Sequence, residues 1–517
     1  MRQFARLAGG TRSYLQHPLD GEAARDQIRR RMGRRRESFL EVADRLVYGQ
    51  PRSPLRAMLL AAGWDQDSLS DSVHERGIEP TLEQLRDDGV HLTLDELKGR
   101  TPIMREGVIF QADESSFDNP YLLGRGIGGT TGGSTSRPRR VAFDWAGLAE
   151  EAADKRLLCE VHGIERAPLA LWLPLPPGIA GVHALLVGAK MGRPPERWFS
   201  PVPRYLAGTP GPMRVMPFYL SWAAGRVGVT LPRPEPVPLD RVVTITDWLR
   251  SALDRHGSAV LRTSASAAVR VAEDAIARGL DLSGAAVLAG GEPLTAPRRE
   301  AIEASGLRAV PRYASAELGL MAGLCGEPSA GDDMHVFEDR MAVVTRRRRL
   351  PGSDREVDSL LFTVISSSCG KVYLNAELGD HAELERRRCG CEFGELGMSL
   401  HLRRVRSHEK LTGEGMGLPA AELDEAVAAC VARLGGGPND YEFRESMGDA
   451  GATRLLIAVS DKLELDEERF AAAVLDELRT GSPGGSLSSE VWRNAGTLKV
   501  VQGRIRDDYK MARVVRS

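Results

Sequence analysis

Short apolar segments alternate with helical patterns between about residues 105 and 400, and no other feature constrains the fold as strongly. Five of these segments are predicted strands, at 169–173, 184–187, 259–261, 285–288 and 307–310, and helical patterns at 265–278 and 296–305 lie between some of them. Alternation of this kind favours an α/β domain built on layered, mostly parallel sheets. Because ligands bind at the carboxyl ends of parallel strands, we expect the chemistry in the loops that follow these strands.

The rest of the chain predicts two further units. Residues 1–100, within which 22–47 is rich in Arg, Glu and Leu, predict a helical region that packs on the large domain at 101–405. Residues 406–517 predict helices at 419–434 and 466–478 and strands at 454–459 and 498–501, an order that suits a small α+β unit. A chain of 517 residues is too long for one hydrophobic core, so several domains are expected.

The composition of the chain limits the kinds of partner that the protein is expected to bind. With 42% hydrophobic residues and a formal net charge of −2, the chain has the balance of a soluble globular protein, and neither nucleic acid nor a membrane is expected as a partner. No apolar run approaches the roughly 18 residues that a membrane span requires. The N-terminal segment has no apolar stretch of a signal peptide, and Asp20 and Glu22 argue against a transit peptide, so we expect a cytoplasmic protein.

The segment 128–136, with the sequence GGTTGGSTS, contains four glycines and five hydroxyl side chains. Glycine lets the backbone approach a ligand closely, and hydroxyl and backbone N–H groups donate hydrogen bonds to phosphate oxygens, so the segment predicts a phosphate-binding loop. A flexible linker is the alternative. The lysine of a Walker motif is absent after Gly133, and the G-x-G-x-x-G string at 124–129 does not open a helix.

Three loops after predicted strands contain polar residues that could contact a ligand. The first is 290–293 with the sequence GGEP, the second contains Glu317, and the third ends at Asp380. Each loop taken alone is also typical of an ordinary turn. Their order along the chain is more specific than any one of them.

In this order and spacing the loops resemble the adenylate-forming superfamily of acyl-CoA synthetases and adenylation domains, most closely its phenylacetate-CoA ligase-like branch. The segment 128–132 is similar to that family's Ser-Gly-Thr-Thr-Gly phosphate loop, with Gly128 in place of serine. The segment 313–317 looks like its Tyr-Gly-x-Thr-Glu element, with Ala314 and Ala316 in place of glycine and threonine. The resemblance extends from about residue 50 to the C-terminus.

The resemblance implies a role for each matching position. Mg²⁺ would be bound by Glu317, which also counts as a catalytic residue, and the ribose hydroxyls of ATP by Asp380. The nucleotide would further contact Gly129, Thr130, Thr131, Gly132, Gly291, Glu292, Tyr313 and Arg406.

Cysteine and histidine residues predict a metal site. Cys389 and Cys391 present two thiolates one residue apart, and Cys325 and His335 lie upstream, so that four ligands suit tetrahedral Zn²⁺. All four positions would be filled by protein, which predicts a structural zinc rather than a catalytic one. Free cysteines in a loop are the alternative. Some phenylacetate-CoA ligase-like proteins have a comparable site.

The C-terminal unit resembles the mobile lid of the family, whose hinge lies next to the motif that 406–409 resembles. Residues 506–513 are similar to its Arg-x-x-Gly-Lys segment, with Tyr509 in place of glycine, and this likeness puts Lys510 at the adenylation lysine. Such a lysine would neutralise charge while the carboxylate attacks the α-phosphate and pyrophosphate leaves.

The sequence therefore predicts an ATP-dependent enzyme that activates a carboxylic acid as an acyl-adenylate and passes the acyl group on, with CoA as the expected acceptor. The branch makes an aromatic acid one candidate. A carrier-protein thiol or an amine is the alternative acceptor, and a homodimer is an open possibility for the assembly. A nucleotide-binding regulatory or structural homologue with weak turnover is the alternative of another class, because Gly128 and Ala316 depart from the family pattern.

Overall fold

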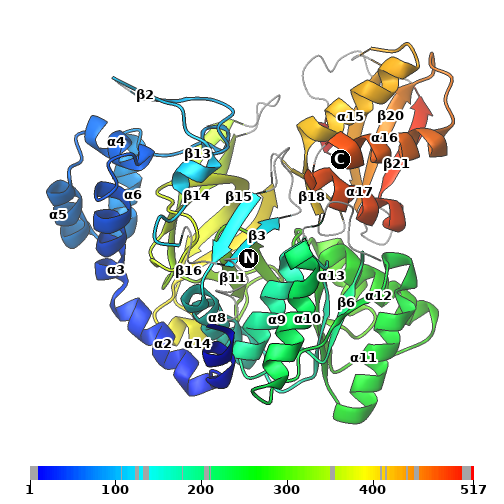
Figure 1. Cartoon of the computed structure of the whole chain (residues 1–517), viewed down its shortest axis with the longest axis horizontal. Helices are drawn as coiled ribbons and strands as arrows, with labels where there is room; N and C mark the ends of the chain where they lie inside the picture. The colour runs from blue at the N-terminus through cyan, green and yellow to red at the C-terminus, as the bar shows by residue number, and fades with distance from the viewer. Residues whose placement is uncertain are drawn as a thin grey trace.

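The structure is a computed structural model that describes residues 10–105, 107–122, 127–131, 139–176, 178–202, 209, 211–349, 356–407, 410–413, 416–437, 440–447, 453–481, 483–503 and 514–516. A large sheet lies at its centre, the N-terminal helices lie along one side, and a separate C-terminal unit lies at the opposite corner of the view (Figure 1). The α/β fold class predicted from the sequence is confirmed.

The large sheet has twelve strands and two halves of different pairing. The parallel half contains, in spatial order, β10 (Arg308–Ser315), β9 (Ala285–Gly290), β8 (Ala259–Ser264), β5 (Leu169–Trp172), β6 (Arg197–Ser200) and β7 (Pro234–Pro236). The antiparallel half continues from β10 through β11 (Gly319–Leu324), β12 (Met334–Val336), β16 (Leu400–Ser407), β15 (Ala376–Arg386), β14 (Glu356–Val364) and β13 (Met341–Arg349). Strand β10 therefore joins the two halves.

Helices cover both faces of the parallel half. They are α8 (Trp145–Val161), α9 (Ala180–Lys190), α10 (Gly211–Gly225), α11 (Val243–His256), α12 (Ala265–Ala277) and α13 (Ala296–Glu303). Alternate residues of a strand point to opposite faces, and Val260 packs in the core with α8 and α9 whereas Leu261 packs in the core with α11 and α12. The parallel strands are buried on both sides, which explains why they read as continuous apolar runs.

One predicted strand is wrong. Residues 184–187 lie in the middle of helix α9, where Val182 and the run from Ala184 to Ala189 are buried. A short run of apolar residues is compatible with a buried strand and with a helix that is buried on most of its surface, because periodicity disappears in both. The remaining four predicted strands correspond to β5, β8, β9 and β10.

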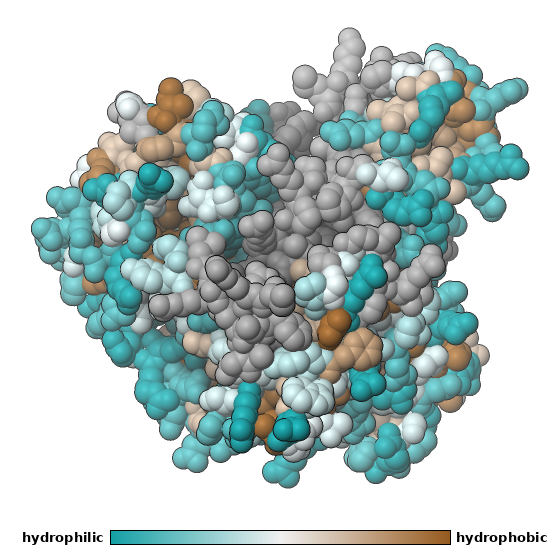
Figure 2. Space-filling model, in the orientation of Figure 1, coloured by the Kyte–Doolittle hydropathy of each residue, from teal (hydrophilic) through white to brown (hydrophobic). Residues whose placement is uncertain are grey.

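The N-terminal helices are α2 (Gly21–Gly33), α3 (Arg35–Val42) with a π-helical turn at Ala43–Tyr48, α4 (Pro54–Ala61), α5 (Gln66–Arg76), α6 (Ile78–Asp87) and α7 (Leu94–Leu97), followed by the hairpin β1 (Ile103–Arg105) and β2 (Val108–Phe110). Among these helices, α2 packs on α8, and the helices from α3 to α7 share the hydrophobic core of the antiparallel half. Leu82 and Leu85 of α6 share one hydrophobic core with Val343 and Leu361 of the sheet. Figure 2 shows mostly hydrophilic residues on the outer surface of these helices, with an apolar patch near the hairpin, where Met104 and Ile109 are exposed.

The C-terminal unit has a four-stranded sheet and its own core. Its elements are α15 (Ala420–Arg433), β19 (Tyr441–Met447), β20 (Thr453–Ser460), α16 (Glu467–Gly481), α17 (Pro483–Ala495), β21 (Leu498–Gly503) and β22 (Val514–Arg516). Val427, Ile457 and Trp492 are fully buried in this core. Two more hairpins contain the remaining strands, namely β3 (Ile127–Thr131) with β4 (Arg139–Phe143), and β17 (Lys410–Gly413) with β18 (Met416–Pro419). Helix α14 (Glu392–Glu395) is a single turn. Among the helices described, none combines the length and apolar character needed to cross a bilayer.

Asn375 joins the N-terminal helices to the sheet. Its side-chain amide donates to the carbonyl oxygens of Leu82 (2.8 Å) and Val90 (3.1 Å), and the residue is fully buried at a φ of 46°. Asparagine tolerates this left-handed conformation better than other residues with a side chain.

We expect Asn375→Ala to lower the free energy of unfolding by about 2–4 kcal/mol, because it removes both hydrogen bonds and places alanine in a left-handed conformation. Asn375→Gly is the matched control, since it removes the same hydrogen bonds without the conformational cost, and it should lose about 1 kcal/mol less. Urea unfolding of the full chain measures both. Wild-type stability in Asn375→Ala would refute the role given to this residue.

Candidate functional site

A cavity of about 250 Å³ lies where the two halves of the large sheet meet. Its walls come from the loop after β9, the end of β10 and the turn that follows it, and strands β15 and β16. Six of the residues that the sequence predicts as nucleotide or Mg²⁺ ligands line this cavity, namely Gly291, Glu292, Tyr313, Glu317, Asp380 and Arg406. The topology explains this convergence, because β9 and β10 are parallel neighbours that end at the same edge, while β15 and β16 belong to the antiparallel half.

A direct hydrogen bond connects the two halves across the cavity. The Tyr313 hydroxyl donates to Oδ2 of Asp380 at 2.6 Å, although the two residues are 67 positions apart in the chain. Burial raises the pKa of Tyr313 well above its usual value, and the charge of Asp380 raises it further, so the phenol stays protonated and remains a donor. The register of β10 against β11 shifts between Tyr313 and Ala314, where the strand bends at the cavity wall.

The loop after β9 has a fixed shape. Gly291 has a φ of 78°, a left-handed conformation that favours glycine. The side chain of Glu292 is fully buried, lies 3.0 Å from Nη2 of Arg298, and accepts a hydrogen bond from the Ser266 hydroxyl at 2.5 Å. Arg298 in turn donates to the carbonyl oxygen of Pro293 at 2.8 Å. The carboxylate of Glu292 is therefore engaged inside the fold, where it supports the loop at the cavity wall.

Glu317 lies in the turn between β10 and β11 and is only 8% exposed. The carboxylate oxygens of Glu317 and Asp380 are hard ligands of the kind that Mg²⁺ prefers, so the cavity has donors that fit this ion. Ala316 is exposed beside Glu317 and offers no hydroxyl to the cavity.

Parts of the predicted site lie outside the described residues. Gly132, the rest of the segment up to Ser136, and Lys510 belong to this group. Gly129, Thr130 and Thr131 form the end of β3, which pairs antiparallel with β4.

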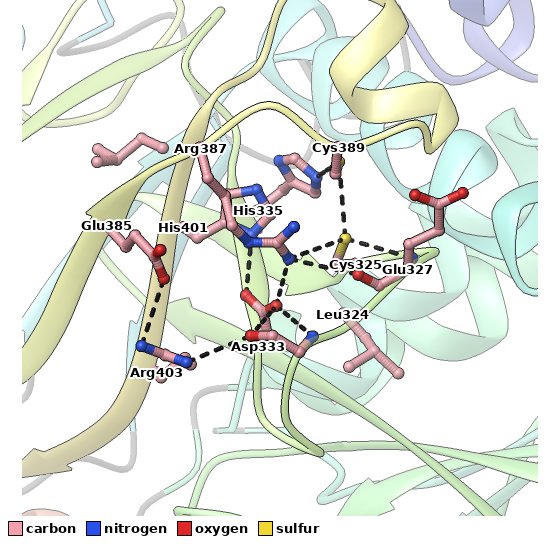
Figure 3. Close-up of polar contacts among 12 residues, drawn as sticks. Leu324, Cys325, Glu327, Asp333, His335, Glu385, Arg387, Cys389, His401 and Arg403 are labelled. Carbon is pink, nitrogen blue, oxygen red and sulfur yellow. Dashed lines mark hydrogen bonds and ion pairs between the residues drawn. The ribbon is translucent and has the colours of Figure 1, made fainter.

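The four predicted metal ligands lie together beside the antiparallel half of the sheet, and Figure 3 shows Cys325, His335 and Cys389 of this set. Nε2 of His335 is 3.1 Å from Sγ of Cys389 and 3.2 Å from Sγ of Cys391. The sulfur of Cys325 is 3.9 Å from that of Cys389 and 3.8 Å from that of Cys391, and the latter two are 3.2 Å apart. Tetrahedral zinc with ordinary bond lengths places its sulfur and nitrogen ligands about 3.3–3.8 Å apart. The distances here, from 3.1 to 3.9 Å, lie within about 0.2 Å of this range, so the cluster fits zinc after small shifts of the side chains.

His401 is a fifth member that sequence reasoning missed. It pairs in register with His335, and ligand atoms of Cys325, His335, Cys389 and His401 all lie within 4.8 Å of one another. Its Nδ1 is 2.8 Å from Oδ1 of Asp333, and its Nε2 is buried without a partner among the described residues. Carboxylates hold metal-binding histidines in this way. The pairing of β12 with β16 brings His401 here, and no local sequence pattern indicates that pairing.

Hydrogen bonds within the cluster favour a thiolate. Donation from Cys325, and after it from His335, lowers the pKa of Cys391, whereas the bond that Cys325 donates and its burial raise the pKa of Cys325. The thiolate is the form of cysteine that binds a metal.

No protein-family model matches the chain, and no curated protein matches it by sequence. Among solved structures, 2-hydroxyisobutyryl-CoA ligase in complex with 2-HIB-AMP and CoA superposes with a TM-score of 0.54 at 15% identity, over 95% of this chain and 90% of that one. The chain has the fold of adenylate-forming ligases. An amide bond synthetase from Marinactinospora thermotolerans matches with a TM-score of 0.43 at 13% identity, over 82% of this chain and 87% of that chain.

The adenylate-forming fold accounts for the cavity's position. Its residues come from segments between 94 and 407 that the sequence places far apart, and the fold gathers them at the junction of the two half-sheets. Sequence motifs predicted the Tyr313 and Asp380 positions separately, but their hydrogen bond joins positions 67 residues apart, and no local pattern predicts it.

Proposed function

We propose that the chain is an ATP-dependent ligase that converts a carboxylic acid to an acyl-adenylate, releases pyrophosphate, and transfers the acyl group to CoA. The observation that carries this proposal is the single cavity that holds Glu317 and Asp380 together with Tyr313 and Gly291. These residues match, one by one, the metal, ribose and purine positions of the family that the sequence resembles.

The residues have distinct tasks in the first half-reaction. Asp380, oriented by the Tyr313 hydroxyl, accepts hydrogen bonds from the ribose hydroxyls, and the Gly291 loop forms the wall beside the adenine. Glu317 would hold Mg²⁺, which would supply positive charge against the triphosphate. A carboxylate oxygen of the acid attacks the α-phosphorus, the bond from that phosphorus to the bridging oxygen breaks, and pyrophosphate leaves with the electron pair.

The second half-reaction needs a nucleophile and a different arrangement of the lid. The thiol sulfur attacks the acyl carbonyl, AMP leaves with the electron pair of the broken C–O bond, and the thiol proton is released. We propose residues 406–517 as the lid, 101–405 as the large domain and 1–100 as a helical region that packs on it. A carrier-protein thiol or an amine would replace CoA without any change in the first step.

A nucleotide-binding homologue with weak turnover is the second candidate, and the exposed Ala316 at the cavity favours it, because this position offers no hydroxyl to a phosphate. Binding of ATP without pyrophosphate exchange for any acid would support this candidate over the ligase.

Asp380→Ala and Glu317→Ala should each reduce acid-dependent ATP–pyrophosphate exchange by roughly 10²-fold or more, since each removes a charged contact in a buried site. Exchange over a panel of aliphatic and aromatic acids is the measurement. Asp254→Ala is the matched control, because this carboxylate is exposed on α11 and pairs only with Arg250 of the same helix among the described residues. Wild-type exchange in both cavity variants would show that the site is misassigned.

A further inference from the structure

A second group of ionisable residues lies behind the cavity, between α8 and the sheet. It consists of Glu151 and Lys155 on α8, His183 on α9, Arg262 on β8 and Arg312 on β10. Arg262 follows Val260 by two residues and so shares the strand face that packs against α8. Arg312 also lines the cavity, which makes it the member that connects the group to the proposed active site.

Glu151 is the one acidic side chain among these five residues, and it is already engaged. Its carboxylate lies 3.6 Å from Nζ of Lys155 and 3.2 Å from Nε2 of His183, and it accepts a hydrogen bond from the backbone of Leu320 at 3.3 Å. Glu151 is 3% exposed and Lys155 is 4% exposed, so water does little to screen these charges.

Neither arginine has an acidic partner among the described residues. Arg262 is 6% exposed, its Nε is buried, and none of the described residues forms a hydrogen bond or ion pair with its guanidinium. Arg312 is partly exposed at the cavity wall, and its Nε is buried without a hydrogen-bond partner in the same part of the chain. A Cβ at Gly290 would lie 3.1 Å from Nη2 of Arg312, so the missing side chain of this glycine is what makes room for the guanidinium.

The balance of charge is positive in every protonation state. Lys155 can lose its proton, and burial followed by the charge of Arg262 lowers its pKa well below the usual value. Arginine cannot do so, because its guanidinium stays charged in proteins. With Lys155 and His183 neutral, Arg262 and Arg312 still outnumber Glu151 by one charge. An unpaired buried charge is destabilising, so an anion that pairs with it would stabilise the site.

We propose, resting on the ligase function above, that the acid activated here carries a second anionic group at its far end, and that Arg262 and Arg312 bind this group. The planar fork of a guanidinium fits carboxylate, sulfonate and phosphate oxygens, which share the same two-oxygen geometry. Arg312, which lines the cavity, would contact the second anionic group first. Arg262 lies behind it on the same face of the sheet. The substrate class is thus a dianionic acid, of which a dicarboxylate is the simplest example.

The test compares pairs of acids that differ by an anionic group at the far end, since glutarate has the chain length of pentanoate and terephthalate adds a second carboxylate to benzoate. Pyrophosphate exchange is measured with pentanoate against glutarate and with benzoate against terephthalate, and 4-sulfobutanoate and 4-phosphonobutanoate separate the three anionic groups. We expect kcat/KM to be roughly 10- to 100-fold higher for the dianionic member of a pair, the worth of a charged hydrogen bond. A preference for pentanoate and benzoate would overturn the proposal.

Variants test which residues cause the preference for a dianionic acid. Arg262→Gln and Arg312→Gln should each reduce the ratio of kcat/KM for glutarate to kcat/KM for pentanoate by roughly tenfold or more, through a higher KM for glutarate. Arg308→Gln is the matched control on β10, because its exposed side chain donates to the carbonyl oxygen of His162 away from the cavity. An equal loss for all acids would mean that the arginines bind the nucleotide or the reacting carboxylate, and would overturn the proposal.

A binding measurement separates this proposal from the function on which it rests. Glutarate should raise the thermal midpoint of the full chain in the absence of ATP, pentanoate should not, and Arg262→Gln should abolish the difference. Arg262→Leu should raise the midpoint of the protein without ligand, since it removes an unpaired buried charge. Stabilisation by glutarate without exchange for any acid would refute the ligase and retain the anion site, whereas no difference between the two acids would refute the site.

Discussion

Cys389→Ser should release the bound metal and lower the thermal midpoint of the large domain by roughly 10 °C or more, because loss of a metal site is among the most destabilising single changes. We propose one structural zinc at Cys325, His335, Cys389 and Cys391, whose ligand atoms lie within about 0.2 Å of the separations of a tetrahedral zinc site. Metal analysis of protein purified without chelator, followed by calorimetry, measures both effects. Zinc-free wild-type protein would refute the proposal.

Two variants decide the fourth ligand. If Cys391 binds the metal, Cys391→Ala should lose it while His401→Ala keeps most of it, and the reverse result would assign that position to His401. Cys369→Ala is the control, because this cysteine is buried in the core outside the cluster and should leave the metal content unchanged.

Lys510→Ala should lower kcat for adenylation by roughly 10²–10³-fold with a much smaller change in KM, because its charge is needed more by the transition state than by bound substrate. Lys510 lies outside the described residues, so this prediction rests on the resemblance of 506–513 to the family's lysine segment. Lys499→Ala is the control, since this lysine is exposed on β21. Undiminished adenylation in Lys510→Ala would show that the alignment is misplaced.

The same variant also tests the proposed lid. Supplied with preformed acyl-adenylate and the acceptor, Lys510→Ala should complete the second half-reaction at nearly the wild-type rate, because the lid would have turned the lysine away. Equal loss in both half-reactions would indicate a folding role for the tail instead.

The sequence predicted the parallel half of the large sheet better than the rest of the fold. Strands β5, β8, β9 and β10 have short apolar runs with helices between them, so local pattern was sufficient. The antiparallel half depends on pairings between segments distant in the chain, such as β12 with β16, and these leave no local trace. At residues 184–187 the local pattern was present but misleading. The apolar run was predicted to be a strand, whereas it belongs to a helix that is buried on most of its surface.

The candidate site likewise contains residues that the sequence predicted and residues that it did not. Tyr313, Glu317 and Asp380 were predicted from motifs, and the structure brings them to one cavity. Arg262 and Arg312 were not predicted, because an arginine in a strand has no motif, and its lack of a partner is visible only once the neighbouring strand face is known. His401 was missed for the same reason.

The metal cluster has a further consequence for the order in which the chain folds. Cys325 follows β11, Cys391 follows β15, and 66 positions separate them, so the cluster exists only after the antiparallel strands have paired. Contacts between such distant positions form late, since loop entropy must be lost first. The metal would therefore bind after the antiparallel half of the sheet has formed, and it would stabilise that half rather than nucleate its folding. A shortage of zinc during synthesis would then reduce the number of mature molecules and leave the turnover of each one unchanged.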